Sequence, residues 1–160
     1  MTLETDPYLP PAAALADITA HGPPPRLWNP NAAANWSLLF SPAFGAFLHM
    51  KNWQALGDAQ RARNSRNWVI AVLGLMFGSL FLGLLMPESK GIDAATRLLG
   101  LSMLISWYVS SAKPQAKLVK ERFGKDYPRR GWAVPILATI GCFIGLVLVF
   151  AVLYAVFGIG

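Results

Sequence analysis

The sequence predicts an all-α fold, a polytopic membrane helical bundle with four membrane segments. Of its 160 residues, 54% are hydrophobic and only 14% are charged, whereas soluble domains carry about 25% charged residues. The apolar residues gather in four runs, and the basic residues lie in the short loops between them. With 14 Lys and Arg against 8 Asp and Glu, the net charge is +6. Because this charge sits next to apolar runs, we expect membrane lipids as its partner and no nucleic acid.

A proline-rich segment precedes the first run. Residues 1–31 hold seven of the twelve prolines, and proline lacks a backbone donor and resists helix formation. We therefore expect a disordered tail over residues 1–31 and one membrane domain over residues 32–160.

Three of the runs fit transmembrane helices, which need about 20 apolar residues to cross the hydrocarbon core. The second, about 68–86, and the fourth, about 132–158, contain no charged side chain. The third, about 92–112, is marginal. Its helix carries Asp93 and Arg97 at the interface, with an i, i+4 spacing that allows them to pair.

The first run, about 32–50, is the most polar of the four. If residues 32–53 form one helix, its polar and small residues fall within about a third of the circumference. This stripe consists of Asn35, Leu38, Pro42, Gly45, His49 and Asn52. Because unsatisfied polar groups are costly in hydrocarbon, we expect the stripe to pack against other helices or to line a wet cavity.

Two residues of the stripe allow more than one interpretation. Pro42 predicts either a kinked packing helix or a broken, re-entrant segment of the kind found at transporter sites. His49 is either a group that handles protons near neutral pH or an interfacial histidine bonded to Asn52 or to a neighbouring carbonyl.

Small residues recur in the other runs at spacings that let helices approach closely. They are Gly74 and Gly78 in the second run, Ser102, Ser106 and Ser110 in the third, and Gly141 and Gly145 in the fourth. These faces predict helix packing within the bundle, with the alternative that one of them binds a partner or a second copy.

The loops predict the orientation in the membrane. Residues 51–67 and 113–131 are strongly basic and are expected in the cytoplasm, whereas residues 87–97 are balanced in charge and are expected on the opposite side. The second basic loop should begin a helix at Pro114. Its candidate contacts to anionic lipid or a cytoplasmic partner are Lys117, Lys120, Arg122, Arg129 and Arg130.

The residues offer little for catalysis. Cys142 is the single cysteine, and the catalytic and nucleotide-binding motifs that are readable from sequence are absent. We therefore expect no metal, no cofactor and no enzyme activity. The favoured function is binding, as an accessory or regulatory partner of another membrane protein or as a self-assembling bundle. The alternatives are an immunity protein that neutralises a pore-forming bacterial toxin, and a passive channel or small-solute carrier.

Two stretches carry a resemblance. DPYLPPAAALADI resembles the NPY-type leaders that precede small bacterial membrane domains. WNPNAAANWSLLFSPAFGAFLHMKNWQALG resembles a segment of uncharacterised multi-spanning proteins of Gram-negative bacteria. The likeness covers roughly residues 6–70. It implies a location in the bacterial inner membrane and brings no activity with it.

Overall fold

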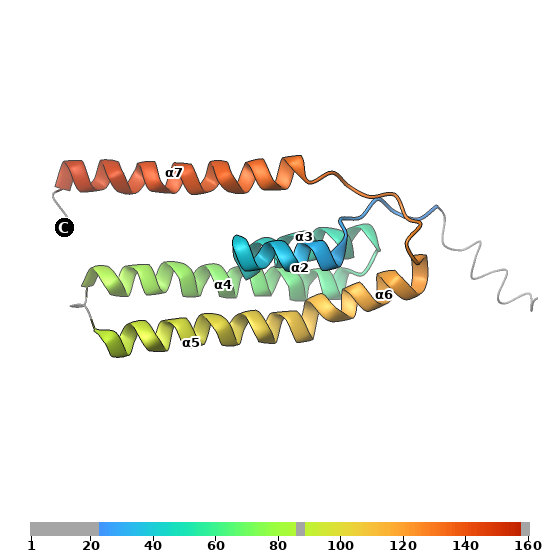
Figure 1. The fold of residues 1–160 in the computed structure, drawn as a ribbon, viewed down its shortest axis with the longest axis horizontal. Coiled ribbons are helices and arrows are strands. Elements are labelled where there is room, and N and C mark those ends of the chain that lie inside the picture. The colour runs from blue at the N-terminus through green and yellow to red at the C-terminus, as the bar shows by residue number, and fades with distance from the viewer. Residues whose placement is uncertain (1–22, 86–88, 158–160) are drawn as a thin grey trace, which may run out of the picture.

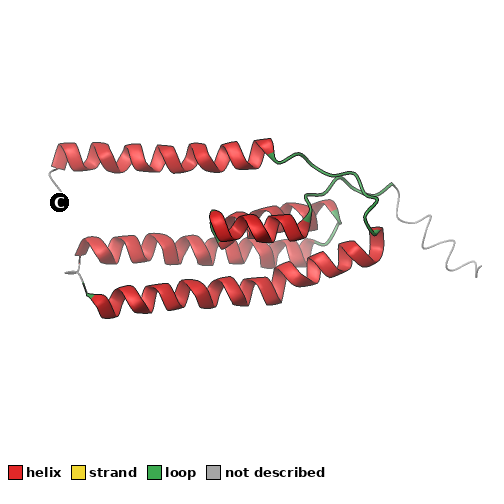
Figure 2. Cartoon of the chain, viewed as in Figure 1, coloured by secondary structure: helices red, strands yellow, loops and turns green. Residues whose placement is uncertain are grey.

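The computed structural model describes residues 23–85 and 89–157, and within these residues the predicted all-α class is confirmed (Figures 1 and 2). The helices are α2 (Pro30–Leu39), α3 (Pro42–Ala55), α4 (Ala59–Leu85), α5 (Lys90–Trp107), the π-helical segment η1 (Tyr108–Ala112), α6 (Lys113–Phe123) and α7 (Ala133–Phe157).

Ordered structure begins earlier than the boundary predicted at residue 31. Residues 1–22 lie outside the described part, but Leu27 is fully buried. Its N–H donates to Pro128 O (3.1 Å), and its carbonyl accepts from Arg130 N–H (2.9 Å). Proline prevents helix here but permits extended pairing, so the end of the proline-rich segment is held against the α6–α7 connection.

The polar first run is two helices and not one. The chain breaks at Ser41, whose backbone is extended and whose Oγ accepts a hydrogen bond from Phe44 N–H (3.4 Å). Pro42 occupies the first turn of α3, where its missing N–H costs nothing. Of the two interpretations of Pro42, the structure therefore supports the broken segment.

Helices α2 and α3 fold back on each other as an antiparallel hairpin. Pro30 at the start of α2 lies beside His49 in α3 (Figure 1). Further along, Ala33 packs with Phe44 and Leu48. The turn at Ser41 therefore forms the tip of the hairpin, and both open ends lie near α6.

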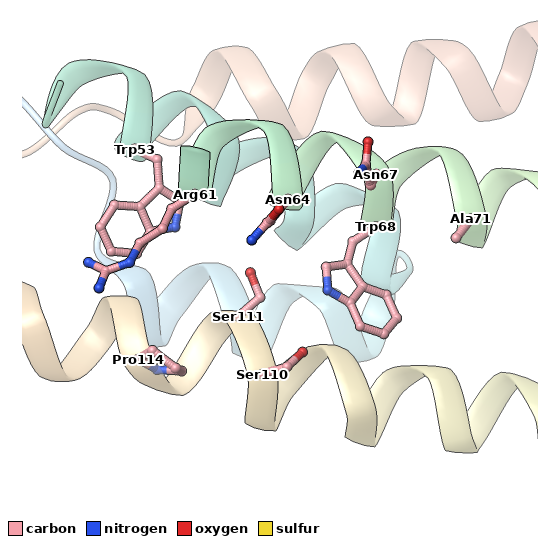
Figure 3. A pocket seen from close by; sticks show the side chains of 9 residues that line it. All are labelled: Trp53, Arg61, Asn64, Asn67, Trp68, Ala71, Ser110, Ser111 and Pro114. Atoms are coloured by element: carbon pink, nitrogen blue, oxygen red, sulfur yellow. The ribbon is translucent and has the colours of Figure 1, made fainter. Parts of the chain in front are cut away.

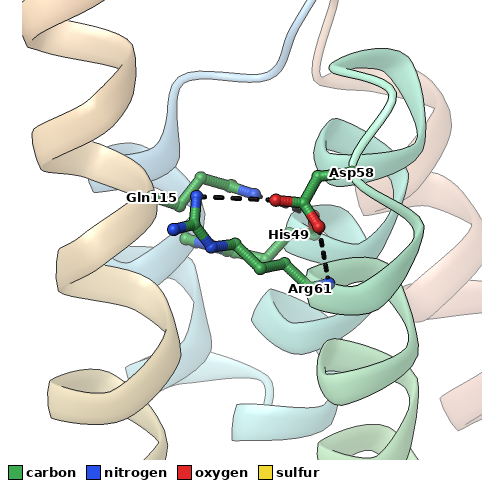
Figure 4. Close-up of polar contacts among 4 residues, drawn as sticks. All are labelled: His49, Asp58, Arg61 and Gln115. Atoms are coloured by element: carbon green, nitrogen blue, oxygen red, sulfur yellow. Dashed lines mark hydrogen bonds and ion pairs between the residues drawn. The ribbon is translucent and has the colours of Figure 1, made fainter.

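Helix α4 starts well before its apolar part. Gly57 reverses the chain with a φ of 77°, a conformation that favours glycine. Asp58 then caps the helix by accepting from Arg61 N–H (2.8 Å), and its carboxylate also pairs with the Arg61 guanidinium (3.5 Å; Figure 4). Much of the basic loop predicted over residues 51–67 is therefore helical, and α4 runs for 27 residues along the hairpin.

Helix α5, η1 and α6 form one continuous rod antiparallel to α4 (Figure 1). The predicted helix start at Pro114 is thus a continuation. A proline inside an α-helix clashes with the carbonyl four residues earlier, which belongs here to Ser110. The wider π-turn at residues 108–112 accommodates the ring without ending the helix.

Helix α7 runs alongside this group but apart from it in Figure 1. Only its start is tied down, through Trp132, which lies 6.4 Å from Trp36 between ring centroids. Two helices among the described residues are long and apolar enough to cross a membrane, over Ala59–Gly83 and Ala133–Val156.

Candidate functional site

A buried polar cluster joins the hairpin to α6 and to the segment before α2. Its centre is Asn52, whose side-chain oxygen accepts from Trp28 N–H (3.0 Å). The Asn52 amide nitrogen donates to Trp28 O (2.8 Å) and to Gln115 Oε1 (3.2 Å). Gln115 in turn donates to His49 O (2.9 Å). Both amides are buried and use donor and acceptor together, so the cluster fixes three segments in one arrangement.

His49 belongs to this cluster and is fully buried (Figure 4). Its Nε2 lies 3.3 Å from Pro30 O, and a carbonyl only accepts, so Nε2 carries the proton. The ring meets Trp107 edge-on at 5.6 Å. Desolvation lowers the pKa of His49 to about 4, against a smaller opposite effect of the bond to Pro30. The ring is therefore neutral at pH 7, as expected for the histidine bonded to a carbonyl.

Gly45 is the one described glycine at which an added Cβ would clash with its surroundings. A Cβ at this position would overlap Ser37 Oγ and lie 2.5 Å from the Trp107 ring. Trp107 is completely buried there, at the end of α5. The glycine is thus required for the indole to fill the space between the hairpin and α5.

The predicted stripe is only half formed. Gly45, His49 and Asn52 share the buried face of α3, but Asn35 and Leu38 are exposed on α2. The break at Ser41 is the reason, because the angular relation between the two halves holds only for an unbroken helix. A continuous polar lining from Asn35 to His49 is not formed.

The predicted glycine faces are open in the structure. Nothing lies within 4 Å of a Cβ built at Gly74, Gly78, Gly141 or Gly145. These faces make no packing contact with other described residues. The spacing marks positions where a close approach is permitted, but it does not identify the partner.

The serine ladder is displaced by one residue. Ser102 and Ser106 are exposed, and Ser110 donates to Ser106 O within its own helix (2.6 Å). The contact between helices is instead made by Ser111, whose Oγ lies 3.4 Å from Ser65 Oγ on α4. The π-turn rotates the residues that follow it, which a regular 3.6-residue period does not anticipate.

Beside this serine pair lies an open pocket of about 520 Å³ between α4 and the rod (Figure 3). Trp53 and Arg61 stand at one end, and Trp68 and Ala71 at the other. Its polar lining comes from Asn64, Asn67, Ser110 and Ser111. The sequence analysis did not identify this pocket, since its two walls are separated by more than forty positions in the chain.

The basic residues predicted to meet lipid or a partner are mostly exposed. Lys117, Lys120, Arg122 and Arg129 face outward, and Lys117 makes an exposed pair with Glu121 (3.8 Å). Arg130 differs because its guanidinium lies over the Trp28 ring at 4.6 Å, and its Nε donates to Arg26 O (2.9 Å). Arg130 therefore has a structural role as well as a charge.

Among the described residues, no group of His, Cys, Asp or Glu is arranged to hold a metal ion. Comparisons with protein-family models, curated proteins and solved structures give no match. The resemblance to small inner-membrane proteins therefore stays a prediction.

Proposed function

We propose that the protein is a multi-pass bacterial inner-membrane protein that acts by binding another transmembrane helix, belonging to a second protein or to a second copy. Helices α4 and α7 cross the membrane in this arrangement, and α5 does so together with η1, which extends it. The hairpin enters without crossing, because α2 has 10 residues and α3 has 14, lengths of about 15 and 21 Å against a core of about 30 Å. The four membrane segments are thus three spans and one re-entrant hairpin.

The distribution of exposed side chains supports this placement. Ile70, Phe77 and Phe81 are exposed on α4, and Leu98 and Ile105 are exposed on α5. Such side chains suit hydrocarbon better than water. The charge lies at the other end of this pair, on the first turns of α4 and on α6, which continues the rod beyond α5. These two segments are called here the basic end. They hold Arg61, Arg63, Arg66, Lys113, Lys117, Lys120 and Arg122. This asymmetry supports a cytoplasmic position for the basic end.

Cysteine labelling tests the orientation. In a Cys142→Ala background, a cysteine at Ser89 should react with an impermeant thiol reagent in intact cells, whereas one at Lys125 should react only after lysis. The reverse pattern would overturn the assignment.

The observation that carries the binding function is α7. It is a helix of 25 residues, and beyond its first two turns nearly all its side chains are exposed, among them Phe143, Val147 and Tyr154. Helices associate in lipid through close packing at small residues, and the Gly141 and Gly145 face of α7 meets no other described residue. A helix tethered at one end, with an open glycine face, is suited to dock on another helix.

Native mass spectrometry of the protein, extracted from its native membrane with a mild detergent, tests this proposal. We expect a stoichiometric second protein or a dimer, and we expect Gly141→Leu with Gly145→Leu to abolish it. Thr139→Leu is the matched control, since this residue lies about 140° around the helix from the glycine face and its hydroxyl bonds only to its own helix (Pro135 O, 2.8 Å). A wild-type protein that is monomeric both from unchallenged cells and from cells challenged with a membrane toxin would refute docking. Neutralisation of a membrane toxin is a special case of the same docking, in which the partner is present only when cells are challenged.

A further inference from the structure

The pocket between α4 and the rod lies where a phospholipid headgroup would sit. On its cytoplasmic side α4 carries Arg61, and within three turns the helix exposes Ile70 and Leu73. Trp53 and Trp68 line the pocket, and tryptophan favours the boundary between headgroups and hydrocarbon. Along the length of the pocket, the exposed side chains of α4 therefore change from charged to apolar.

The lining supplies donors suited to a phosphodiester. Asn64, Asn67 and Trp68 lie on one face of α4 at i, i+3 and i+4 and line the pocket, and Figure 3 shows the side chains of Asn64 and Trp68 directed to the space before Ser110 and Ser111. Gln60 donates to Asn64 Oδ1 (3.4 Å), which orients the Asn64 amide so that its nitrogen remains a donor to the pocket.

One cation completes the set. The Arg61 guanidinium lies over the Trp53 ring at 4.8 Å, so its position is fixed by packing as well as by charge. Its pair with Asp58 (3.5 Å) is partly exposed, which reduces the positive charge without removing the planar donors. A single arginine with several neutral amides matches a group of charge −1, as in a phosphodiester, better than a doubly charged phosphate monoester.

The π-turn shapes the opposite wall. Ser111 is drawn under the pocket by its contact with Ser65, whereas Ser110 and Pro114 remain exposed at the surface. π-turns of this kind are frequent at binding sites.

From these observations we infer that the pocket binds the phosphodiester headgroup of a membrane phospholipid, with Arg61 and Asn64 as its ligands. This site is distinct from the general attraction of lipid to the exposed lysines of α6, and it is independent of docking by α7.

Native mass spectrometry of the full-length protein, titrated with phosphatidylglycerol in detergent, provides the test. We expect one lipid retained per chain, and at least tenfold weaker retention for Arg61→Gln and for Asn64→Leu. Arg66→Gln is the matched control. It removes the same charge from the same helix, but Arg66 is exposed and does not line the pocket. Its retention should stay within twofold of wild type.

Two further probes separate the sources of the phosphate. Diacylglycerol shares the acyl chains but lacks the phosphodiester, so we expect no retention of it. Inorganic phosphate at millimolar concentration should leave lipid retention unchanged. Equal loss in all three variants, no loss in the two pocket variants, or displacement by inorganic phosphate would each overturn the inference. Because the substituted side chains are exposed, thermal melting of each variant should match wild type and shows that the fold is intact.

Discussion

The basic end of the molecule and its long apolar helices are held in different ways. At the basic end, Asn52, Gln115 and His49 form a buried hydrogen-bonded cluster that binds the hairpin, α6 and the segment before α2 together. In the other half, α4, α5 and α7 expose most of their apolar side chains, and α7 has no helix packed along its length among the described residues. The cluster fixes the ends of these helices relative to one another, and the long helices leave much of their apolar surface uncovered by other described residues.

The largest effect should come from the centre of the cluster. Asn52→Leu removes the bonds to Trp28 and leaves Gln115 Oε1 without its donor. Because the abandoned groups are buried, we expect a loss of about 3 kcal/mol in the free energy of unfolding. Denaturant unfolding in detergent measures it. Asn35→Leu is the control, an exposed asparagine that should change stability by less than about 0.5 kcal/mol. Equal losses would mean that the cluster is not what holds this end.

Acid should weaken the same end. The pKa of His49 is about 4 in the folded protein against an ordinary value of 6.5, so the unfolded chain binds the proton more readily between these values. The stabilisation is complete above pH 6.5 and is lost as the pH falls towards 4, by up to about 3 kcal/mol. His49→Leu should remove this part of the pH dependence, which unfolding curves at pH 7 and pH 4.5 would show. An identical slope in the variant would assign the acid sensitivity to other groups.

A glycine substitution should distinguish the two halves directly. Gly45→Ala places a methyl group against Ser37 and Trp107, and we expect it to cost about 1–3 kcal/mol by overpacking. Gly78→Ala meets nothing, and should stabilise α4 slightly through its helix propensity. Thermal melting of the two variants checks this. A destabilising Gly78→Ala would mean that α4 makes a close contact at Gly78 that is absent among the described residues.

The smallest effect is expected at the joint between the halves. Ser111→Ala removes one serine contact with Ser65, and such bonds between membrane helices contribute about 0.6 kcal/mol. Ser102→Ala, at an exposed position on α5, should be neutral by comparison. If Ser111→Ala lowers the free energy of unfolding by more than about 2 kcal/mol, the serine pair is as important for stability as the buried polar cluster around Asn52.

The helical class and the approximate limits of the long helices could be predicted, because apolar runs and charged loops are local in sequence. The break at Ser41 was open to prediction too, since Ser followed by Pro is typical of a helix start. It was one of two interpretations because the same proline also fits a kink.

The cluster and the pocket could not be predicted in the same way. Asn52 meets Gln115 across 63 positions, and Trp107 fills the space over Gly45 from another helix. Neither relation leaves a periodic trace in the chain. The glycine pairs at 74 and 78 and at 141 and 145 do have a regular spacing in the sequence. This spacing shows only where another helix could approach closely, and not which helix does so.

The π-turn before Pro114 changes which direction the side chains of the rod face about its helix axis. Relative to an α-helix it inserts one residue, so everything beyond it is rotated by about 100°. In the present phase Trp107 faces Gly45 from one side of the turn while Gln115 and Val119 face Asn52 and Leu27 from the other. Deleting a single residue from 108–112 would leave all of these side chains in the protein. Only the contacts on one side of the turn could then still form, either that of Trp107 or those of Gln115 and Val119.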